Sequence, residues 1–171
     1  AVVVIYKYSE KEPTDLNTNV PIEIENVTSK NINDALIYEP EVKINEFKRF
    51  LDAGDCGFYA YLNGQFIHRS WVTFGPKTEF LWRGCAPLEI KENEAFIRWG
   101  ETVPLARGRG VTPYVLTHIL SVLSGRVTSF YISTTDDNIA SKRGIEKADF
   151  SLISRYEVKR FLGLKAEKNL G

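Results

Sequence analysis

Two arginines and two glycines stand together in the segment RGRG, residues 107–110, between a strand-like run and a run with helical periodicity. The first turn of a helix leaves backbone N–H groups without partners and carries a partial positive charge, so a loop at this place can bind an anion. Glycines let the backbone close around the anion, and the guanidinium groups of Arg107 and Arg109 match phosphate oxygens. The segment therefore predicts a site for a diphosphate group.

An ordinary capped helix is the alternative interpretation of the same segment. Thr112 is a suitable N-cap and Pro113 a suitable first helical residue, and many helices begin in this way. The sequence lacks the GxxxxGK[ST] pattern of nucleotide-binding P-loops, and one RGRG tetrapeptide is too short to indicate a nucleic-acid-binding tract. On spacing alone the segment favours the capped helix, so the choice depends on the rest of the chain.

A second motif, NIASKRGIEKADF, follows at residues 138–150, after one helical and one strand-like segment. Together the two segments resemble the GNAT superfamily of acyl-CoA-dependent N-acyltransferases. The phosphate-binding signature of that family, Arg/Gln-x-x-Gly-x-Gly/Ala with a preceding proline, is matched by Arg107, Gly110 and Pro104. The second signature is matched by Asn138, Ala140, Ser141, Glu146, Lys147 and Phe150. The resemblance is close from Glu94 to Phe150 and concerns only the order of strands and helices before that.

The resemblance implies where an acyl-CoA would bind. The pantetheine arm would pair like an additional strand with the backbone of Thr102 and Val103, where two central strands separate. Asn138 would contact the pantetheine or the backbone beside it. The implied cosubstrate is acetyl-CoA or a related acyl-CoA, and no metal is implied. The diphosphate would lie on the loop formed by Arg107, Gly108, Arg109, Gly110, Val111 and Thr112.

The resemblance also implies acyl transfer to a primary amine. A typical amine is protonated at neutral pH and must lose a proton before it attacks a thioester, so the reaction needs a general base. We predict that Glu101 is this base, because it lies at the end of its strand in phase with Trp99 and Ile97 by the period of two. Trp99 and Ser133 are predicted to contact the acceptor. Without the family match, Glu101 would be interpreted as an exposed carboxylate at a strand end.

Two positions depart from the family pattern. Thr112 replaces the last Gly or Ala of the loop, and we expect its hydroxyl to donate to a phosphate. Ile145 stands where many members carry the tyrosine that protonates the departing CoA thiolate, which leaves Tyr114 and Tyr131 as substitute acids. The missing tyrosine keeps a second function open: a domain that binds acyl-CoA or CoA and regulates or assembles without catalysis.

Alternating strands and helices must position these residues. Runs of β-branched residues and a period of two predict strands, whereas a period of 3.6 predicts helices. The expected strands are Ala1–Tyr8, Ile22–Val27, Phe58–Leu62, Gln65–Phe74, Glu94–Val103, Val127–Thr134 and one or two within Phe150–Phe161, and the expected helices are Lys43–Leu51, Tyr114–Leu123 and Asn138–Lys147. Asn63-Gly64 predicts a hairpin turn. The order predicts an α/β (α+β) class: one GNAT-like domain over residues 1–171, with a mixed twisted sheet and helices on both faces.

The composition limits the expected partners. The chain has 171 residues, with 22 basic and 22 acidic side chains, and 43% of its residues are hydrophobic. Balanced charge provides no global field for nucleic acid or an anionic membrane, and no apolar run reaches the roughly 20 residues that span a bilayer. We therefore expect a small-molecule amine acceptor, such as a metabolite or amino sugar, and no nucleic-acid or membrane partner. A homodimer stays open.

The remaining residues that could do chemistry are few. Cys56 and Cys85 lack metal-ligand spacing and are expected to be free thiols in a reducing compartment. The N-terminal AVVVIYKYSE has neither a basic flank nor a cleavage site, so a cytoplasmic protein is expected. His68 and His118 have no third ligand at metal spacing and are expected to be structural.

Overall fold

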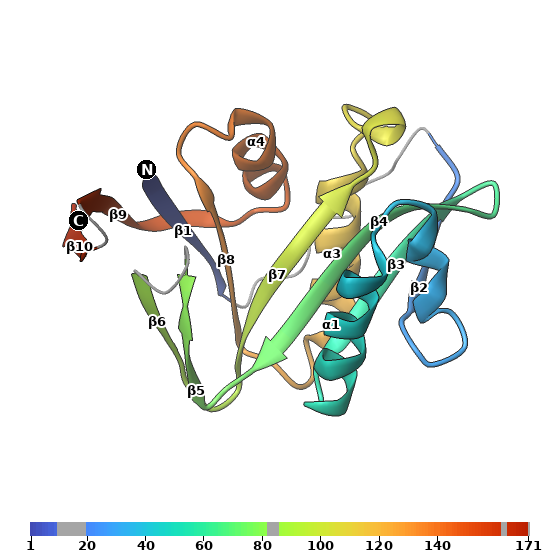
Figure 1. Cartoon of the computed structure of the whole chain (residues 1–171), viewed down its shortest axis with the longest axis horizontal. Coiled ribbons are helices and arrows are strands. Elements are labelled where there is room, and N and C mark those ends of the chain that lie inside the picture. The colour runs from blue at the N-terminus through green and yellow to red at the C-terminus, as the bar shows by residue number, and fades with distance from the viewer. Residues whose placement is uncertain (10–19, 82–85, 162–163, 171) are drawn as a thin grey trace.

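One mixed sheet of eight strands runs through the molecule (Figure 1). The computed structural model describes residues 1–9, 20–81, 86–161 and 164–170. Among the described strands, β7 and β8 are parallel, and the other neighbouring pairs in this sheet are antiparallel. From one edge to the other the strands are β10 (Leu164–Asn169), β9 (Ser151–Phe161), β1 (Val2–Ser9), β8 (Ser129–Thr135), β7 (Glu94–Thr102), β4 (Gln65–Phe74), β3 (Cys56–Leu62) and β2 (Ile22–Asn26).

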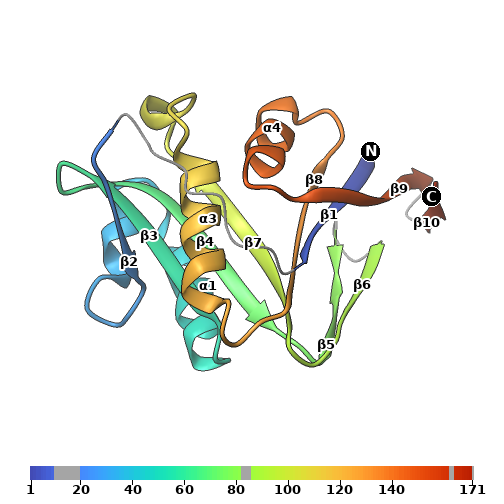
Figure 2. The same ribbon diagram turned by 180° about the vertical axis from the view of Figure 1, so that it is seen from behind.

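Helices cover both faces of this sheet. α1 (Glu41–Asp52) lies on the face seen in Figure 1, and α3 (Val111–Leu123) lies on the opposite face, which Figure 2 turns toward the viewer. α4 (Ile139–Lys147) packs against α3. Two short 3-10 helices, η1 (Ile32–Ile37) and η2 (Pro104–Ala106), precede α1 and α3. The predicted class, a mixed sheet with helices on both faces, is confirmed.

Each helix buries the apolar residues that recur along one of its sides. Ile44 and Phe47 of α1 are buried against the sheet together with Trp71 of β4. Fully burying one such side chain stabilises the fold by about 1.5–3 kcal/mol. The residues that α3 buries are Val111, Pro113, Val115, Leu116, Ile119, Leu120 and Leu123.

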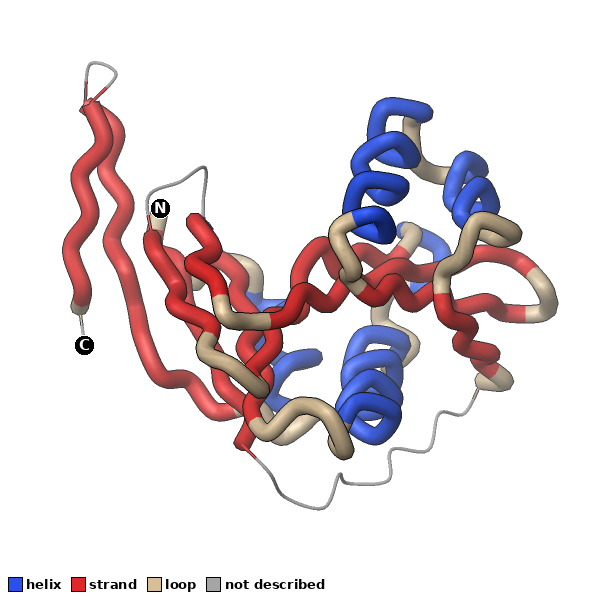
Figure 3. Tube along the Cα trace, turned by 90° about the horizontal axis from the view of Figure 1, so that it is seen from below, coloured by secondary structure: helices blue, strands red, loops and turns tan. Residues whose placement is uncertain are grey.

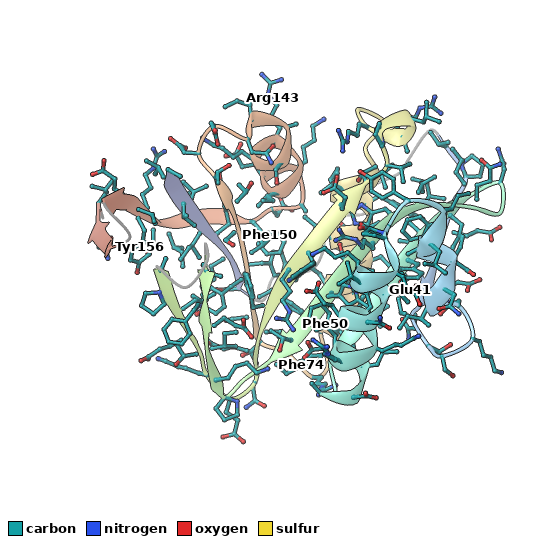
Figure 4. The ribbon with its side chains drawn as sticks, viewed as in Figure 1. Glu41, Phe50, Phe74, Arg143, Phe150 and Tyr156 are labelled. Atoms are coloured by element: carbon teal, nitrogen blue, oxygen red, sulfur yellow. The ribbon has the colours of Figure 1, made fainter. Side chains whose placement is uncertain are left out.

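A hairpin outside the main sheet covers another part of the α1 face. It consists of β5 (Lys77–Phe80) and β6 (Ala86–Ile90), which the sequence interpretation did not predict. Its Leu88 and Ile90 bury apolar side chains of β1, and Tyr156 of β9 packs against the same cluster (Figure 4). Cys56 is a free thiol, whereas Cys85 lies outside the described residues.

The N-terminal strand lies between two strands from the other end of the chain. Ile5 of β1 is opposite Ser133 of β8 on one side and opposite Ser154 of β9 on the other. Figure 3 shows the β9–β10 pair at the edge of the sheet, with the C-terminus beside it. The strand ladder therefore joins residues 2–9 to the second half of the fold.

Two local predictions have different outcomes. The Asn63-Gly64 turn is confirmed, because both residues have positive φ, 52° and 76°, between β3 and β4. The predicted start of α3 is wrong: the helix begins at Val111, and its N-cap is Gly110 in the left-handed conformation rather than Thr112. A side-chain cap is therefore missing at this helix end, which bears on the site.

Candidate functional site

β7 and β8 pair over their first halves and then separate. The parallel register joins Glu94–Ile97 to Ser129–Ile132, whereas β7 continues to Thr102 and β8 to Thr135. Figure 1 shows the two strands diverging toward the ends that lead to α3 and α4. The later residues of both strands therefore lie outside the parallel ladder, as predicted from the family resemblance.

A β-bulge in β7 lies where the strands separate. Arg98 pairs with Trp71 and Glu101 pairs with Arg69, so two residues of β7 lie opposite the single residue of β4 between them. The two residues are Trp99 and Gly100, which lie opposite Ser70. Trp99 has a φ of 56°, a left-handed conformation that is unfavourable for a residue with a Cβ. Such bulges bend a strand and change the direction of its side chains.

The bulge corrects one prediction. Ile97 and Trp99 were expected on one face, but Ile97 is buried in the cluster beneath α3, whereas Trp99 packs against the cluster beneath α1. The extra residue in β7 breaks the period of two and causes this difference. Glu101 does contact the α1 side, where the Tyr38 hydroxyl donates to its Oε1 at 3.4 Å. Trp99 and Glu101 therefore share a face.

The predicted phosphate loop is open at both glycines. Gly108 and Gly110 have φ values of 75° and 76°, and a Cβ built on either would have no atom within 4 Å. Gly110 supplies no side-chain cap to α3, so the first N–H groups of the helix keep their capacity to bind an anion. Val111 is buried, which leaves its backbone as the part that faces the loop. Arg109 is exposed beside it.

Arg107 connects this loop to the end of β7. Its Nε donates to the Thr102 carbonyl at 3.0 Å, and a terminal nitrogen pairs with Glu101 Oε1 at 2.9 Å. The Arg107 side chain is 56% exposed and that of Glu101 is 37% exposed, so water screens the pair. The structure thus brings the predicted base and the predicted phosphate ligand into direct contact.

Beneath the loop, a chain of hydrogen bonds joins β4, β7 and α3. His68 Nδ1 lies 2.7 Å from Thr102 Oγ1, and His68 Nε2 lies 2.8 Å from Ser70 Oγ. Thr102 Oγ1 in turn lies 3.4 Å from Thr112 Oγ1. The Thr112 hydroxyl, predicted to face a phosphate, is thus directed toward Thr102. The Val103 N–H donates to the Ile67 carbonyl, so the Val103 amide faces β4 rather than a ligand.

The Thr102 backbone has a different direction from that of Val103. Because alternate residues of an antiparallel strand face opposite neighbours, the bond from Val103 to β4 directs the N–H and C=O of Thr102 away from β4. The Thr102 carbonyl indeed accepts from Arg107. Of the two predicted pantetheine partners, Thr102 is the one whose backbone groups face the separated side of β7.

His68 gives the fold a pH dependence that a variant can isolate. Burial, with a smaller contribution from Arg69, lowers the pKa of His68 from 6.5 to about 3. Below pH 6.5 the unfolded chain binds a proton here that the folded chain does not, so stability is lost as the pH falls toward 3. We expect the free energy of unfolding to fall by up to about 1.4 kcal/mol per pH unit more in the parent than in His68→Gln. Urea denaturation at pH 7, 5.5 and 4 measures the difference, and parallel pH profiles would contradict it.

The α1 face near Glu101 holds groups that could meet an acceptor. The Trp99 ring packs edge-on against Phe50 of α1, with centroids 5.5 Å apart, and Figure 4 shows Phe50 over this face. Lys43 Nζ lies 3.8 Å from the Trp99 ring centroid. Ser133 shares this face, because it lies opposite Ile5, whose side chain belongs to the cluster under the β5–β6 hairpin. The two residues predicted to contact the acceptor, Trp99 and Ser133, and the predicted base, Glu101, thus lie on one face.

α4 provides the remaining predicted contact. Asn138 is its exposed N-cap, and the Oδ1 atom accepts from the Ser141 N–H at 3.1 Å. Ile145 is fully buried in the cluster beneath α3, so no side-chain donor occupies that position. Tyr131 donates to Glu94 Oε1 at 3.1 Å, in the paired part of β7 and β8. Tyr114 lies half-buried in the first turn of α3.

A buried ion pair beside the bulge was not predicted from the sequence. Arg69 of β4 pairs with Glu39, which precedes α1, and also donates to the Trp99 carbonyl. Two other missed residues, Tyr38 and Lys43, lie next to Glu101 and Trp99. One sequence signal was available: a charged residue within QFIHRSWVTF, an otherwise strand-like run, requires a buried partner.

Comparison with solved structures identifies the architecture. A GNAT-family acetyltransferase from Colwellia psychrerythraea superposes with a TM-score of 0.64 at 14% identity, over 90% of this chain and 53% of the other. The fold is the GNAT fold. An aminoglycoside N-acetyltransferase in complex with CoA gives a TM-score of 0.57 at 15% identity, over 82% and 96% of the two chains. A glucosamine N-acetyltransferase region of a fungal multi-domain β-N-acetylglucosaminidase gives 0.63 at 12% identity, over 91% and 20%.

The GNAT fold is recognised from structure, since no protein-family model and no curated protein matches the sequence. The chain spans little more than half the length of several matched chains, including 58% of a Staphylococcus epidermidis protein of unknown function. Within the described residues, no helix is long and apolar enough to cross a membrane. The same residues contain no group of three or more His, Cys, Asp or Glu side chains arranged to hold a metal ion.

Proposed function

We propose that this chain is an acyl-CoA-dependent N-acyltransferase domain that transfers an acetyl or related acyl group to the primary amine of a small metabolite or amino sugar. The observation that carries the proposal is the separation of β7 and β8 beside an uncapped helix N-terminus within a GNAT fold. Bound acyl-CoA supplies the activated thioester carbonyl. All other steps are assigned to residues of this chain.

The residues at the separated end suit an acyl-CoA. A pantetheine arm carries amide groups, and the N–H and C=O of Thr102 on the exposed edge of β7 offer them strand-like partners. A diphosphate carries negative charge, and the open loop from Arg107 to Thr112 offers backbone N–H groups, two glycines without steric obstruction and two guanidinium groups. Asn138 lies at the neighbouring helix end and is assigned a contact with the arm.

Glu101 is assigned the role of general base. It takes a proton from the amine, directly or through water, as the amine nitrogen attacks the thioester carbonyl and the bond from carbon to sulfur breaks. In the free chain Arg107 pairs with Glu101 and also with the Thr102 carbonyl. Because a diphosphate binds guanidinium groups strongly, its arrival draws Arg107 away and leaves the Glu101 carboxylate and the Thr102 carbonyl available.

The proton for the leaving thiolate needs another donor, because Ile145 has none. We assign Tyr114, since Tyr131 is engaged by Glu94 in the paired part of the strands. A free thiol has a pKa of about 8.5, so a thiolate leaves with little assistance and water can also protonate it.

The class of acceptor is assigned from the overall charge of the chain and from the names of the matched structures. The names of two matched structures specify aminoglycoside and glucosamine acetylation. Trp99 offers an apolar face, and balanced overall charge gives no field for a basic polypeptide. We assign the protein to the cytoplasm and leave its oligomeric state to measurement.

A second candidate function is an acyl-CoA-binding module without catalysis. The buried Ile145 favours it, because this position offers no acid for the leaving group. Measured catalytic turnover distinguishes the acyltransferase from the binding module.

Two experiments test both candidate functions. The first is calorimetric titration with acetyl-CoA, longer acyl-CoAs and CoA, and the second is a thiol-release assay over a panel of amines. We expect a Kd in the micromolar range for at least one acyl-CoA, which corresponds to about −8 kcal/mol. Thiol release with an amino sugar or small amine supports the enzyme, and tight binding without release for any amine supports the module. Absence of binding near millimolar concentrations would falsify both.

A further inference from the structure

Arg69 is a charged residue in the interior of the sheet. Its side chain and that of Glu39 are each only 8% exposed, and one terminal nitrogen of Arg69 lies 2.5 Å from Glu39 Oε1. The Arg69 Nε donates to the same carboxylate at 2.6 Å. A buried ion pair stabilises a fold little compared with apolar residues of the same volume, so this geometry suggests a positioning role.

The third nitrogen of the Arg69 guanidinium supports this positioning role. It donates to the carbonyl of Trp99, the left-handed residue of the bulge in β7. The guanidinium carbon also lies 5.9 Å from the Trp99 ring centroid and 5.3 Å from that of Phe47. Arg69 thus connects the bulge to α1 and to Glu39, the residue next to the N-cap of α1.

The hydrogen bond from Arg69 to the Trp99 carbonyl also determines the direction of the next N–H group. In a planar trans peptide the carbonyl of one residue and the N–H of the next point in opposite directions. Because Arg69 holds the Trp99 carbonyl, the N–H of Gly100 points away from Arg69. Gly100 is exposed and lies in the part of β7 that has separated from β8.

The family resemblance implies that a backbone N–H of this strand meets the thioester oxygen. We propose that Arg69 and Glu39 are positioning residues that hold the Trp99–Gly100 peptide in the direction that makes the Gly100 N–H this donor. This inference rests on the proposed acyl transfer. A fixed N–H at this place stabilises the negative charge that develops on the oxygen during attack. The carboxylate of Glu39 is needed because it holds two nitrogens of Arg69 and thereby directs the third at Trp99.

The test replaces the whole pair, Arg69→Met with Glu39→Met, so that no unpaired charge is left buried. The matched control is Arg98→Met with Asp55→Met. That pair is also a mostly buried arginine–carboxylate pair, with 2.5 Å between Arg98 and Asp55. Arg98 lies in β7, the strand that contains the bulge. Among the hydrogen bonds found in the described residues, neither Arg98 nor Asp55 has one to the carbonyl of Trp99. Circular dichroism and thermal melting establish that both double variants fold.

Two measurements follow on each folded variant. Infrared difference spectra with acetyl-CoA labelled with ¹³C at the carbonyl report the hydrogen bond to the thioester oxygen without requiring turnover. We expect the bound band of the parent and the control to lie below that of free acetyl-CoA, and the band of the Arg69/Glu39 variant to return toward the free value. We expect kcat of that variant to fall about 10²-fold, the scale for loss of one such donor, whereas its acyl-CoA Kd rises by about 10-fold or less and the pKa values of its rate profile stay unchanged.

The outcomes separate this inference from the proposed function. A folded Arg69/Glu39 variant with the parental band and kcat overturns the positioning role. A parent that binds acetyl-CoA with an unshifted band also overturns it, whether or not an amine is acylated. A shifted band in the parent that returns toward the free value in the Arg69/Glu39 variant supports the positioning role even where no amine is acylated, and that absence of turnover contradicts catalysis. A parent that binds no acyl-CoA overturns both.

Discussion

Replacing Gly110 with aspartate is expected to weaken acetyl-CoA binding by about 100-fold or more, whereas replacing it with asparagine weakens binding by about 10-fold or less. Both side chains have the same shape, and both visit the left-handed region more readily than other residues with a Cβ. Gly110 has a φ of 76° and open space around its Cβ position, so the Cβ of either substitution meets no neighbour. The two variants therefore differ mainly in one negative charge.

That charge lies where an anion would bind. The aspartate carboxylate would satisfy the first N–H groups of α3 and repel a diphosphate, whereas the neutral asparagine leaves the helix dipole uncompensated. Isothermal titration with acetyl-CoA gives the two affinities, and thermal melting shows that both variants fold. Equal affinities for aspartate and asparagine would mean that the segment is only a helix start, the alternative left open by its sequence.

The strand–loop–helix order around the loop was predictable from sequence because it depends on neighbouring residues. A strand, two glycines with arginines and a helix follow one another within residues 94–123, and the structure places them in that order. The Asn63-Gly64 turn was predictable for the same reason. The start of α3 was misplaced because Thr112 and Pro113 are good capping residues wherever they occur, and only the backbone conformation of Gly110 excludes them from the cap.

Features that depend on distant residues were not predictable. The bulge in β7 is defined by its register with β4, and no residue of β7 alone reveals that Trp99 and Gly100 lie opposite one residue. The same holds for Arg69 and Glu39, 30 positions apart, and for His68 and Thr102, 34 positions apart. The place of β1 between β8 and β9 likewise follows from pairing across most of the chain.

Substituting Glu101 with glutamine is expected to lower the rate of acyl transfer at neutral pH by roughly 10²-fold, the usual scale for loss of a general base. Glutamine keeps the shape of the side chain and the contact with the Tyr38 hydroxyl, but it cannot accept the proton of the amine. The loss should become smaller as the pH approaches the pKa of the amine, because more of the acceptor then arrives neutral.

The contact with Arg107 supplies a second readout for the same variant. In the free chain Glu101 and a diphosphate would compete for this guanidinium, and the pair is exposed, so its loss changes acyl-CoA affinity only slightly, by about threefold or less and toward tighter binding. The control is Glu92→Gln, an exposed carboxylate in the turn before β7. Initial rates with saturating acetyl-CoA between pH 6 and pH 10, measured for the parent and both variants, separate a base from a ligand of Arg107. A parental pH–rate profile in Glu101→Gln assigns the proton to water or to the substrate, whereas a uniform loss at every pH assigns Glu101 to binding the acceptor rather than to deprotonating it.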